Sequence, residues 1–242
     1  MTEPAARAAL AFALDVPTLR EATQLVECLA SDVGVFKVGL ELFISAGPEA
    51  VSMLHHRGAK CFLDLKLHDI PATVERSVNA AIELGVSYLT LHAACGPQAL
   101  RQAATAAQGT SLQLLAVTLL TSLDAPALQT LGFGESPHQV VARLATMAAD
   151  AGVMGMVTSA QECAQLRAQL GSDATLVVPG IRPDGADHAD QMRVASPYAA
   201  IQAGANVLVV GRPIRDAVDP LAAARAILAE VSQALRSQVV NT

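Results

Sequence analysis

Residues 64–71, with the sequence DLKLHDIP, concentrate titratable side chains where an apolar, strand-like run gives way to a helical pattern. Because successive side chains of a strand point to opposite faces, we expect Asp64, Lys66 and His68 to project to one side and the two intervening leucines to be buried on the other. Asp69 follows at the end of the strand. Carboxylates, an ammonium group and an imidazole gathered in this way can transfer protons and stabilise charge, so the segment is a candidate catalytic site.

A purely structural interpretation of this segment is also open. Asp64 and Lys66 could form an ion pair on a solvated strand face, the histidine could be a polar neighbour, and Asp69 could cap the next helix. The proline at position 71 is favoured as the first residue of a helix. Ile70 would then occupy the N-cap, a position that it suits poorly, so the capping interpretation is weakened.

The elements that must position these residues follow from an alternation along the whole chain. Short apolar runs, typical of buried strands, are separated by amphipathic stretches rich in Ala, Leu, Glu, Gln and Arg, which favour helix. The strand-like runs are residues 10–16, 35–40, 61–67, 88–92, 112–120, 155–158, 175–178 and 206–210. The helical stretches include residues 18–30, 71–84, 137–149, 161–170 and 220–235. Eight strands alternating with helices predict an α/β fold, a (β/α)₈ TIM barrel.

Length and composition set the class of protein. A chain of 242 residues without a linker or a shift in composition is expected to form one barrel domain, residues 1–242. No charge-free apolar run is long enough for a membrane span, and a net charge of −6 without a basic run argues against nucleic-acid binding. The four cysteines lack the spacing of a metal site or a disulfide framework, and they indicate mostly buried free thiols in a reducing compartment. Because the N-terminus also lacks the pattern of a signal peptide, we expect the protein in the cytoplasm.

Polar residues recur where the expected strands end. Barrel enzymes build their active sites at the carboxyl ends of the strands, so these residues are expected to converge. A scatter of solvated charges would not choose one end of the barrel repeatedly. The residues are Asp15, Lys37, Asp64, Lys66, His92, Thr121, Ser122, Arg182, Gly211 and Arg212.

Two of these strand ends indicate an anion site. At Gly211 and Arg212, a backbone without a side chain and a planar guanidinium could hold phosphate oxygens, and barrels often bind phosphate after strands seven and eight. Residues 179–191 form a polar loop rich in glycine and proline after strand seven, and we expect it to act as a lid. The alternative for Gly211 and Arg212 is an ordinary strand-to-helix turn with an exposed arginine. The alternative for residues 179–191 is a surface loop without a role in binding.

A metal site is a further possibility. Asp64, His68, Asp69 and His92 could be arranged as ligands of a barrel epimerase. Lys66 argues against this arrangement, because its ammonium group would compete with a dication for the same carboxylates. We therefore expect no metal and no cofactor, with both histidines in hydrogen-bonding or structural roles.

Taken together, these motifs resemble the orotidine 5′-monophosphate decarboxylase family over almost the whole chain. The matching segments, in family order, are residues 13–15 (ALD), 36–39 (FKVG), 62–71 (FLDLKLHDIP), 120–122 (LTS), 179–183 (PGIRP), 190–191 (DQ) and 210–214 (VGRPI). The resemblance implies a carbon–carbon lyase that converts orotidine 5′-monophosphate to uridine 5′-monophosphate and CO₂ without a cofactor, in the last step of de novo UMP synthesis. Lys66 would deliver the proton to C6 of the pyrimidine.

The resemblance also implies roles for other residues. An alternating charge network would comprise Lys37, Asp64, Lys66 and Asp69. In a homodimer, Asp69 and Thr73 would reach into the neighbouring subunit's site; their spacing of four places both on one helical face.

The implied substrate contacts involve residues from several strands. Asp15 would hold the ribose, and Thr121 and Ser122 the base. Substrate contacts are also implied for Lys37, Asp64 and Thr73. The implied phosphate-binding residues are Arg182, Gln191, Gly211 and Arg212.

Three alternatives remain at the level of sequence. A related metal-dependent sugar-phosphate decarboxylase shares the spacing of Asp64, Lys66 and Asp69 but not the full uracil- and ribose-binding set. A metal-dependent pentose-phosphate epimerase is the second alternative. The third, from a different class, is a non-catalytic protein that binds a phosphorylated ligand.

Overall fold

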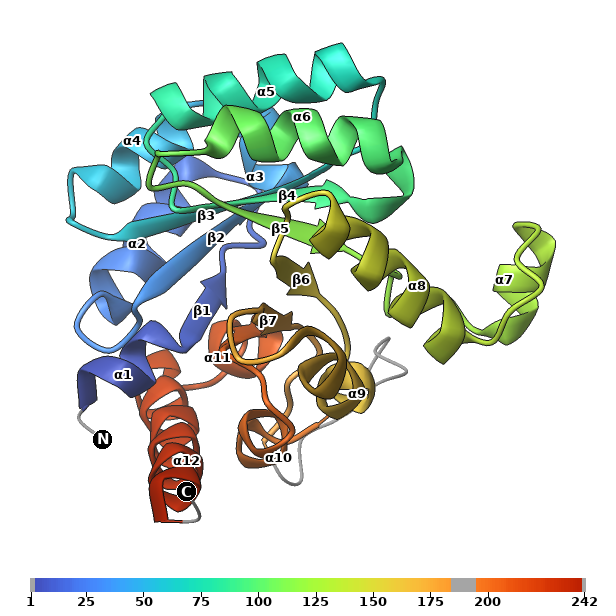
Figure 1. Ribbon diagram of the computed structural model, residues 1–242. Helices are drawn as coiled ribbons and strands as arrows, with labels where there is room; N and C mark the ends of the chain where they lie inside the picture. Colours follow the sequence, from blue (N-terminus) through green and yellow to red (C-terminus); the bar gives the residue numbers. More distant parts are fainter. Residues whose placement is uncertain (1–2, 184–194, 241–242) are drawn as a thin grey trace.

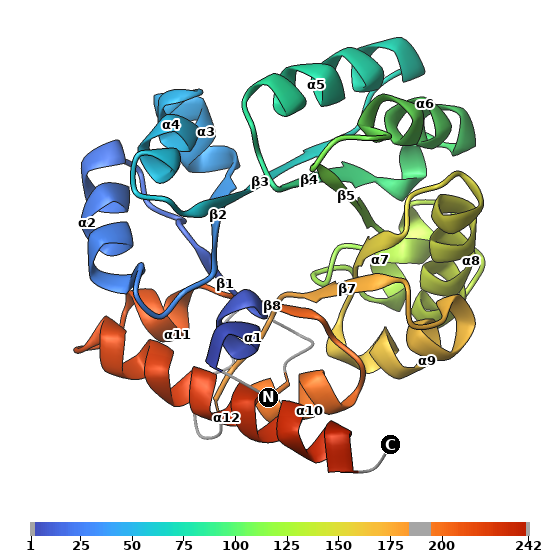
Figure 2. The ribbon, with the colours of Figure 1, turned by 60° about the vertical axis from the view of Figure 1, so that its left-hand side comes forward.

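The computed structural model describes residues 3–183 and 195–240. In this part of the chain, eight parallel strands form a closed barrel in which each strand pairs with the next and β8 pairs with β1. Helices surround the barrel on the outside, as Figure 2 shows most clearly. The strands are β1 (Leu10–Ala13), β2 (Val35–Gly39), β3 (Lys60–Leu67), β4 (Tyr88–His92), β5 (Gln113–Val117), β6 (Gly155–Val157), β7 (Thr175–Val178) and β8 (Val207–Val210). The (β/α)₈ barrel expected from the sequence is confirmed.

Most helices lie between successive strands and cover the outer face of the barrel, whereas α1 precedes β1, α12 follows β8 and α7 projects away from the barrel (Figure 1). They are α1 (Glu3–Ala8), α2 (Leu19–Leu29), α3 (Leu40–Ala46), α4 (Glu49–His55), α5 (Pro71–Glu83), η1 (Ala93–Cys95), α6 (Pro97–Ala107), α7 (Ala125–Thr130), α8 (Pro137–Asp150), α9 (Ala160–Leu170), α10 (Pro197–Gln202), α11 (Arg212–Arg215) and α12 (Pro220–Val240). No helix among the described residues has the length and apolarity that a membrane crossing requires.

The core has an outer and an inner part. On β1, Leu10 and Phe12 belong to the large cluster shared with the helices, whereas Ala11 and Ala13 belong to a small cluster inside the barrel. This alternation explains why the strands read as continuous apolar runs, since both faces are buried. The inner cluster therefore lies in the barrel interior, below the strand ends that carry the predicted site residues.

Predicted and observed strand limits differ mainly at the carboxyl ends. β4 and β7 have the predicted limits, but β1 and β5 end three residues earlier than expected. Val16 and Leu119 are buried although they lie beyond the strands. Burial without strand pairing therefore made the apolar runs longer than the strands themselves.

β3 is irregular at its carboxyl end, but the expected alternation of side chains persists there. The pairing with β4 shifts register between Leu63 and Leu67, and Lys66 adopts a left-handed backbone with φ of 50°. Leu65 and Leu67 are half-buried against the outer core, and His68, just beyond the strand, is exposed. The irregularity therefore interrupts the pairing of β3 with β4, as β-bulges do, and leaves the leucines on the outer side.

The start of α5 agrees with the prediction from proline. Pro71 is the first helical residue, and Ile70 is an N-cap with extended backbone and no side-chain hydrogen bond. Asp69 is not the cap; its Oδ1 accepts a hydrogen bond from the Ile70 N–H at 2.6 Å. This contact holds the Asp69 carboxylate in the loop between β3 and α5.

Candidate active site

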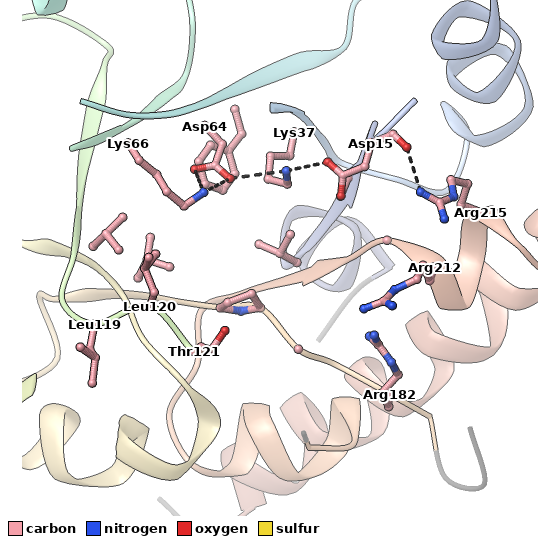
Figure 3. A pocket seen from close by; sticks show the side chains of 18 residues that line it. Asp15, Lys37, Asp64, Lys66, Leu119, Leu120, Thr121, Arg182, Arg212 and Arg215 are labelled. Carbon is pink, nitrogen blue, oxygen red and sulfur yellow. Dashed lines mark hydrogen bonds and ion pairs between the residues drawn. The ribbon is translucent and has the colours of Figure 1, made fainter. Parts of the chain in front are cut away.

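A cavity of about 430 Å³ opens at the carboxyl ends of the strands (Figure 3). Its floor includes Ala13, Phe62 and Val209 from the inner cluster of the barrel. The full lining is Ala13, Asp15, Lys37, Phe62, Asp64, Lys66, Val117, Leu119, Leu120, Thr121, Val157, Pro179, Gly180, Arg182, Val209, Gly211, Arg212 and Arg215. Charged groups thus surround a pocket whose base is apolar.

Alternating charges form a row along one wall of this cavity (Figure 3). Lys37 Nζ lies 3.0 Å from Asp15 Oδ1 and 3.4 Å from Asp64 Oδ2. Lys66 Nζ lies 2.9 Å from both oxygens of Asp64. Lys37 lies on β2, Asp64 and Lys66 lie on β3, and Asp15 follows β1, so the parallel order of the barrel places the row at one edge.

Asp64 is the buried centre of the row. Its side chain is 10% exposed, against 32% for Lys66 and 49% for Asp15. Burial alone raises the pKa of Asp64, but attraction to Lys37 and Lys66, with hydrogen bonds from Lys66 and Thr90, outweighs burial and leaves the pKa below its usual value. Asp64 is therefore a carboxylate at neutral pH.

Thr90 on β4 completes the surroundings of Asp64, and the sequence analysis missed it. The side chain is fully buried, and its hydroxyl donates to Asp64 Oδ1 at 2.9 Å. The signal was present in β4, whose sequence YLTLH alternates polar residues with leucines. That period places Thr90 on the inner face of the barrel.

Guanidinium groups line another part of the cavity. Arg182 and Arg212 both point into it from the segments after β7 and β8 (Figure 3). Arg182 is held in a buried position, where its Nη1 donates to the Ile181 carbonyl at 2.8 Å and its backbone N–H to Ala195. Arg182, Gly211 and Arg212, the residues predicted to bind an anion, thus line the same cavity.

Arg215 is a third arginine at the cavity and was also missed. Its Nη1 donates to the backbone carbonyl of Asp15 at 2.8 Å, and its other nitrogens bind Asp216. The contact joins α11, after β8, to the loop after β1. A sequence signal was weak, because an arginine three residues into a helix is commonly a solvated residue.

Not every predicted residue reaches this cavity. The structure brings together Asp15, Lys37, Asp64, Lys66, Thr121, Arg182, Gly211 and Arg212. Asp69, Thr73 and Ser122 are not part of the lining within the same chain. Gln191 and residues 184–190 of the expected lid lie outside the described residues.

The two histidines near the site lie beside each other rather than in the cavity. The rings of His68 and His92 have centroids 5.2 Å apart. Burial lowers the pKa of His92, and repulsion from His68 and Lys66 lowers it further. Among the described residues, no three His, Cys, Asp or Glu side chains are grouped as metal ligands would be.

Comparisons with known proteins agree with this geometry. Residues 8–227 match the family described as Orotidine 5′-phosphate decarboxylase / HUMPS family. The chain belongs to this family. It is 51% identical over 217 residues, 90% of the chain, to an Orotidine 5′-phosphate decarboxylase of Anaeromyxobacter sp. (strain K), 95% of which is covered. A relative of the same name from Thermobifida fusca is 47% identical over 229 residues, covering 93% of this chain and 97% of the relative.

A solved structure of the decarboxylase family has the same fold. The crystal structure of Orotidine 5′-phosphate decarboxylase from Lactobacillus acidophilus matches with a TM-score of 0.82 and 36% sequence identity. The match covers 92% of this chain and 98% of that one. Near-complete coverage in both directions means that the likeness extends over most of the chain.

The charge row predicts how stability depends on pH. We expect Asp64→Asn to lower the free energy of unfolding at neutral pH by about 3 kcal/mol, because it leaves two cations beside a buried neutral amide. The pKa of Asp64 is lower in the folded chain than its usual value of 3.8, so its contribution is complete above 3.8 and is lost as pH falls through the folded pKa.

Urea denaturation of both proteins across this pH range tests the prediction. The difference between wild type and Asp64→Asn should shrink as pH falls below 3.8. Asp173→Asn, at an exposed carboxylate, is the matched control and should change stability little at any pH. A difference at Asp64 that stays constant with pH would contradict the assignment.

Proposed function

We propose that this protein decarboxylates orotidine 5′-monophosphate to uridine 5′-monophosphate and CO₂ without a cofactor, as a carbon–carbon lyase in the last step of de novo UMP synthesis. One observation carries the proposal: the Lys66 ammonium group, held by both oxygens of Asp64 at 2.9 Å, lines a cavity that also holds Arg182 and Arg212. The named relatives support the same activity and do not favour the sugar-phosphate, epimerase or binding-protein alternatives.

The chemistry requires a cation and a proton at one atom. When the bond between C6 and the carboxylate breaks, the electron pair stays on C6, where the ring delocalises it poorly. A cation about 4 Å away stabilises such a charge by about 4 kcal/mol at an effective dielectric near 20. Lys66 supplies this cation and then gives a proton to C6, and its amine is reprotonated from solvent.

Asp64 has two effects in this proposal. It keeps the Lys66 ammonium group in place through two hydrogen bonds, and its charge disfavours a substrate carboxylate bound beside it. Losing CO₂ removes that repulsion. Lys37, on the far side of Asp64, holds the carboxylate and bridges it to Asp15.

Substrate binding is assigned to the remaining lining. Asp15 holds the ribose, Thr121 with Ser122 contacts the base, and Arg182 with Arg212 holds the phosphate. We also assign phosphate contacts to Gly211 and to Gln191. Binding energy gained at the phosphate, away from the reacting carbon, can orient the ring and so contribute to the rate.

We further propose a homodimer in which Asp69 and Thr73 act in the neighbouring subunit's cavity. Both residues lie at the same end of the barrel as the cavity but outside its lining. Large exposed apolar side chains lie after β2 and β3, at Leu40, Ile44 and Ile70, with exposed fractions of 51%, 81% and 67%. Surfaces of this kind favour burial against a partner.

We place the single barrel domain, residues 1–242, in the cytoplasm. The four cysteines are free thiols, as a reducing compartment favours. Cys61 and Cys163 are buried, and burial raises the pKa of each thiol to about 12. Cys28, in contrast, is exposed, so the expectation of mostly buried thiols does not extend to it.

The loss of ultraviolet absorbance of orotidine 5′-monophosphate tests the activity. We expect turnover that is insensitive to a chelator and that falls by about 10⁴-fold or more in Lys66→Ala, because both the cation and the proton donor are removed. Lys60→Ala, at the exposed amino end of the same strand, is the control and should retain activity.

The outcomes separate the alternatives. Turnover of a sugar phosphate that a chelator abolishes would replace the proposal with the metal-dependent decarboxylase. Binding of uridine 5′-monophosphate by a wild-type protein that never consumes orotidine 5′-monophosphate would indicate a non-catalytic binding protein.

Arg212→Ala should raise KM and also lower kcat. The lost charge-assisted hydrogen bonds predict a decrease in kcat/KM of about 10- to 100-fold, part of it in kcat because phosphate binding helps to orient the ring. Steady-state kinetics beside Arg101→Ala, an exposed arginine on α6, measures the effect. A change confined to KM would refute the link between phosphate binding and rate.

Mixing two inactive variants tests the shared site. In a mixed dimer of Lys66→Ala and Asp69→Ala, one site combines a wild-type Lys66 with the Asp69 of the other subunit. After random exchange of subunits at equal amounts, we expect about a quarter of wild-type activity. If Asp69 serves its own chain, every site in the mixture lacks one of the two residues and no activity returns.

A further inference from the structure

Thr90 lies opposite the irregular part of β3. The register pairs Leu63 with Leu89 and then Leu67 with Leu91. Between these pairs β3 contains three residues, Asp64 to Lys66, whereas β4 contains one, Thr90. The two strands are therefore out of step where β3 carries the proposed catalytic groups.

The Thr90 hydroxyl bridges this mismatch as both an acceptor and a donor of hydrogen bonds. It accepts a hydrogen bond from the Lys66 backbone N–H at 2.8 Å and donates one to Asp64 Oδ1 at 2.9 Å. A side-chain oxygen thus serves as the acceptor for a strand N–H that is out of register with β4. The side chain is fully buried, so solvent cannot substitute for it.

The backbone of Lys66 needs such a contact. A left-handed conformation, here φ of 50°, is unfavourable for a residue with a Cβ and persists where neighbouring contacts stabilise it. Two contacts hold Lys66: its N–H binds Thr90, and its Nζ binds Asp64. Because Thr90 also binds Asp64, one hydroxyl orients both ends of the pair.

We propose that Thr90 is a positioning residue of the decarboxylation site, which holds the Lys66 backbone in its left-handed conformation and fixes the Asp64 carboxylate against the Lys66 ammonium group. The inference rests on the proposed function. Thr90 does not line the cavity, so it acts through Asp64 and Lys66 rather than by touching the substrate.

Thr90→Val and Thr90→Ser separate this role from packing. Valine keeps the shape but leaves the Lys66 N–H and Asp64 Oδ1 without the hydroxyl, whereas serine keeps the hydroxyl and loses a methyl group. We expect Thr90→Val to lower kcat by about 10- to 100-fold, because small displacements of catalytic groups cost this much. Thr90→Ser should recover most of the loss.

Two further readouts distinguish positioning from general damage. Binding of uridine 5′-monophosphate, which lacks the carboxylate, should be nearly unchanged in Thr90→Val, because ribose and phosphate contacts lie elsewhere in the cavity. The acid limb of the kcat profile should move to higher pH, since a hydrogen bond that lowers the pKa of Asp64 has been removed. Thr175→Val, on β7, is the control; its hydroxyl accepts from Gln113 and does not line the cavity.

The outcomes decide the inference separately from the function. If the wild type is active and Thr90→Val has the wild-type kcat, the positioning role is overturned and the proposed decarboxylase function still stands. Equal losses in Thr90→Val and Thr90→Ser, with weakened nucleotide binding in both, would also overturn it, because packing would then be the cause. A wild type without turnover would instead refute the proposed function.

Discussion

A buried carboxylate between two ammonium groups is the interaction on which the rest of the site depends. Asp64 is nearly excluded from solvent, and an isolated charge there would be costly. Lys37 and Lys66 form ion pairs with the Asp64 carboxylate from either side, and the Thr90 hydroxyl donates a hydrogen bond to its Oδ1. The barrel makes this possible because neighbouring parallel strands end at the same edge, within reach of one another.

The cavity separates its charges in a way that suits a substrate with two anionic ends. The row of two aspartates and two lysines is balanced in formal charge, whereas the opposite part of the lining contributes arginines without an equal number of carboxylates. An apolar floor from the barrel interior lies between them. The phosphate is thus assigned to a cationic region, and the reacting carboxylate to a region where positive and negative groups are held at fixed positions.

Much of the fold was predictable because burial on both faces makes parallel strands visible as apolar runs. β4 and β7 were predicted with their observed limits. The carboxyl ends of β1 and β5 were not, because buried loop residues such as Val16 and Leu119 are as apolar as strand residues. The start of α5 was predictable from Pro71, whose fixed φ is local information that needs no tertiary contact.

The sequence by itself determined the chemical types at the strand ends, the order of the strands and the family resemblance, since these depend on local patterns and on spacing along the chain. Only the tertiary structure decided that Lys66 adopts a left-handed backbone within β3, that Thr90 binds Asp64, and that Arg215 reaches the loop after β1. The two hydrogen bonds join residues 26 and 200 positions apart in sequence. Their geometry depends on closure of the barrel and on a register shift between two strands, neither of which leaves a periodic signal in either strand alone.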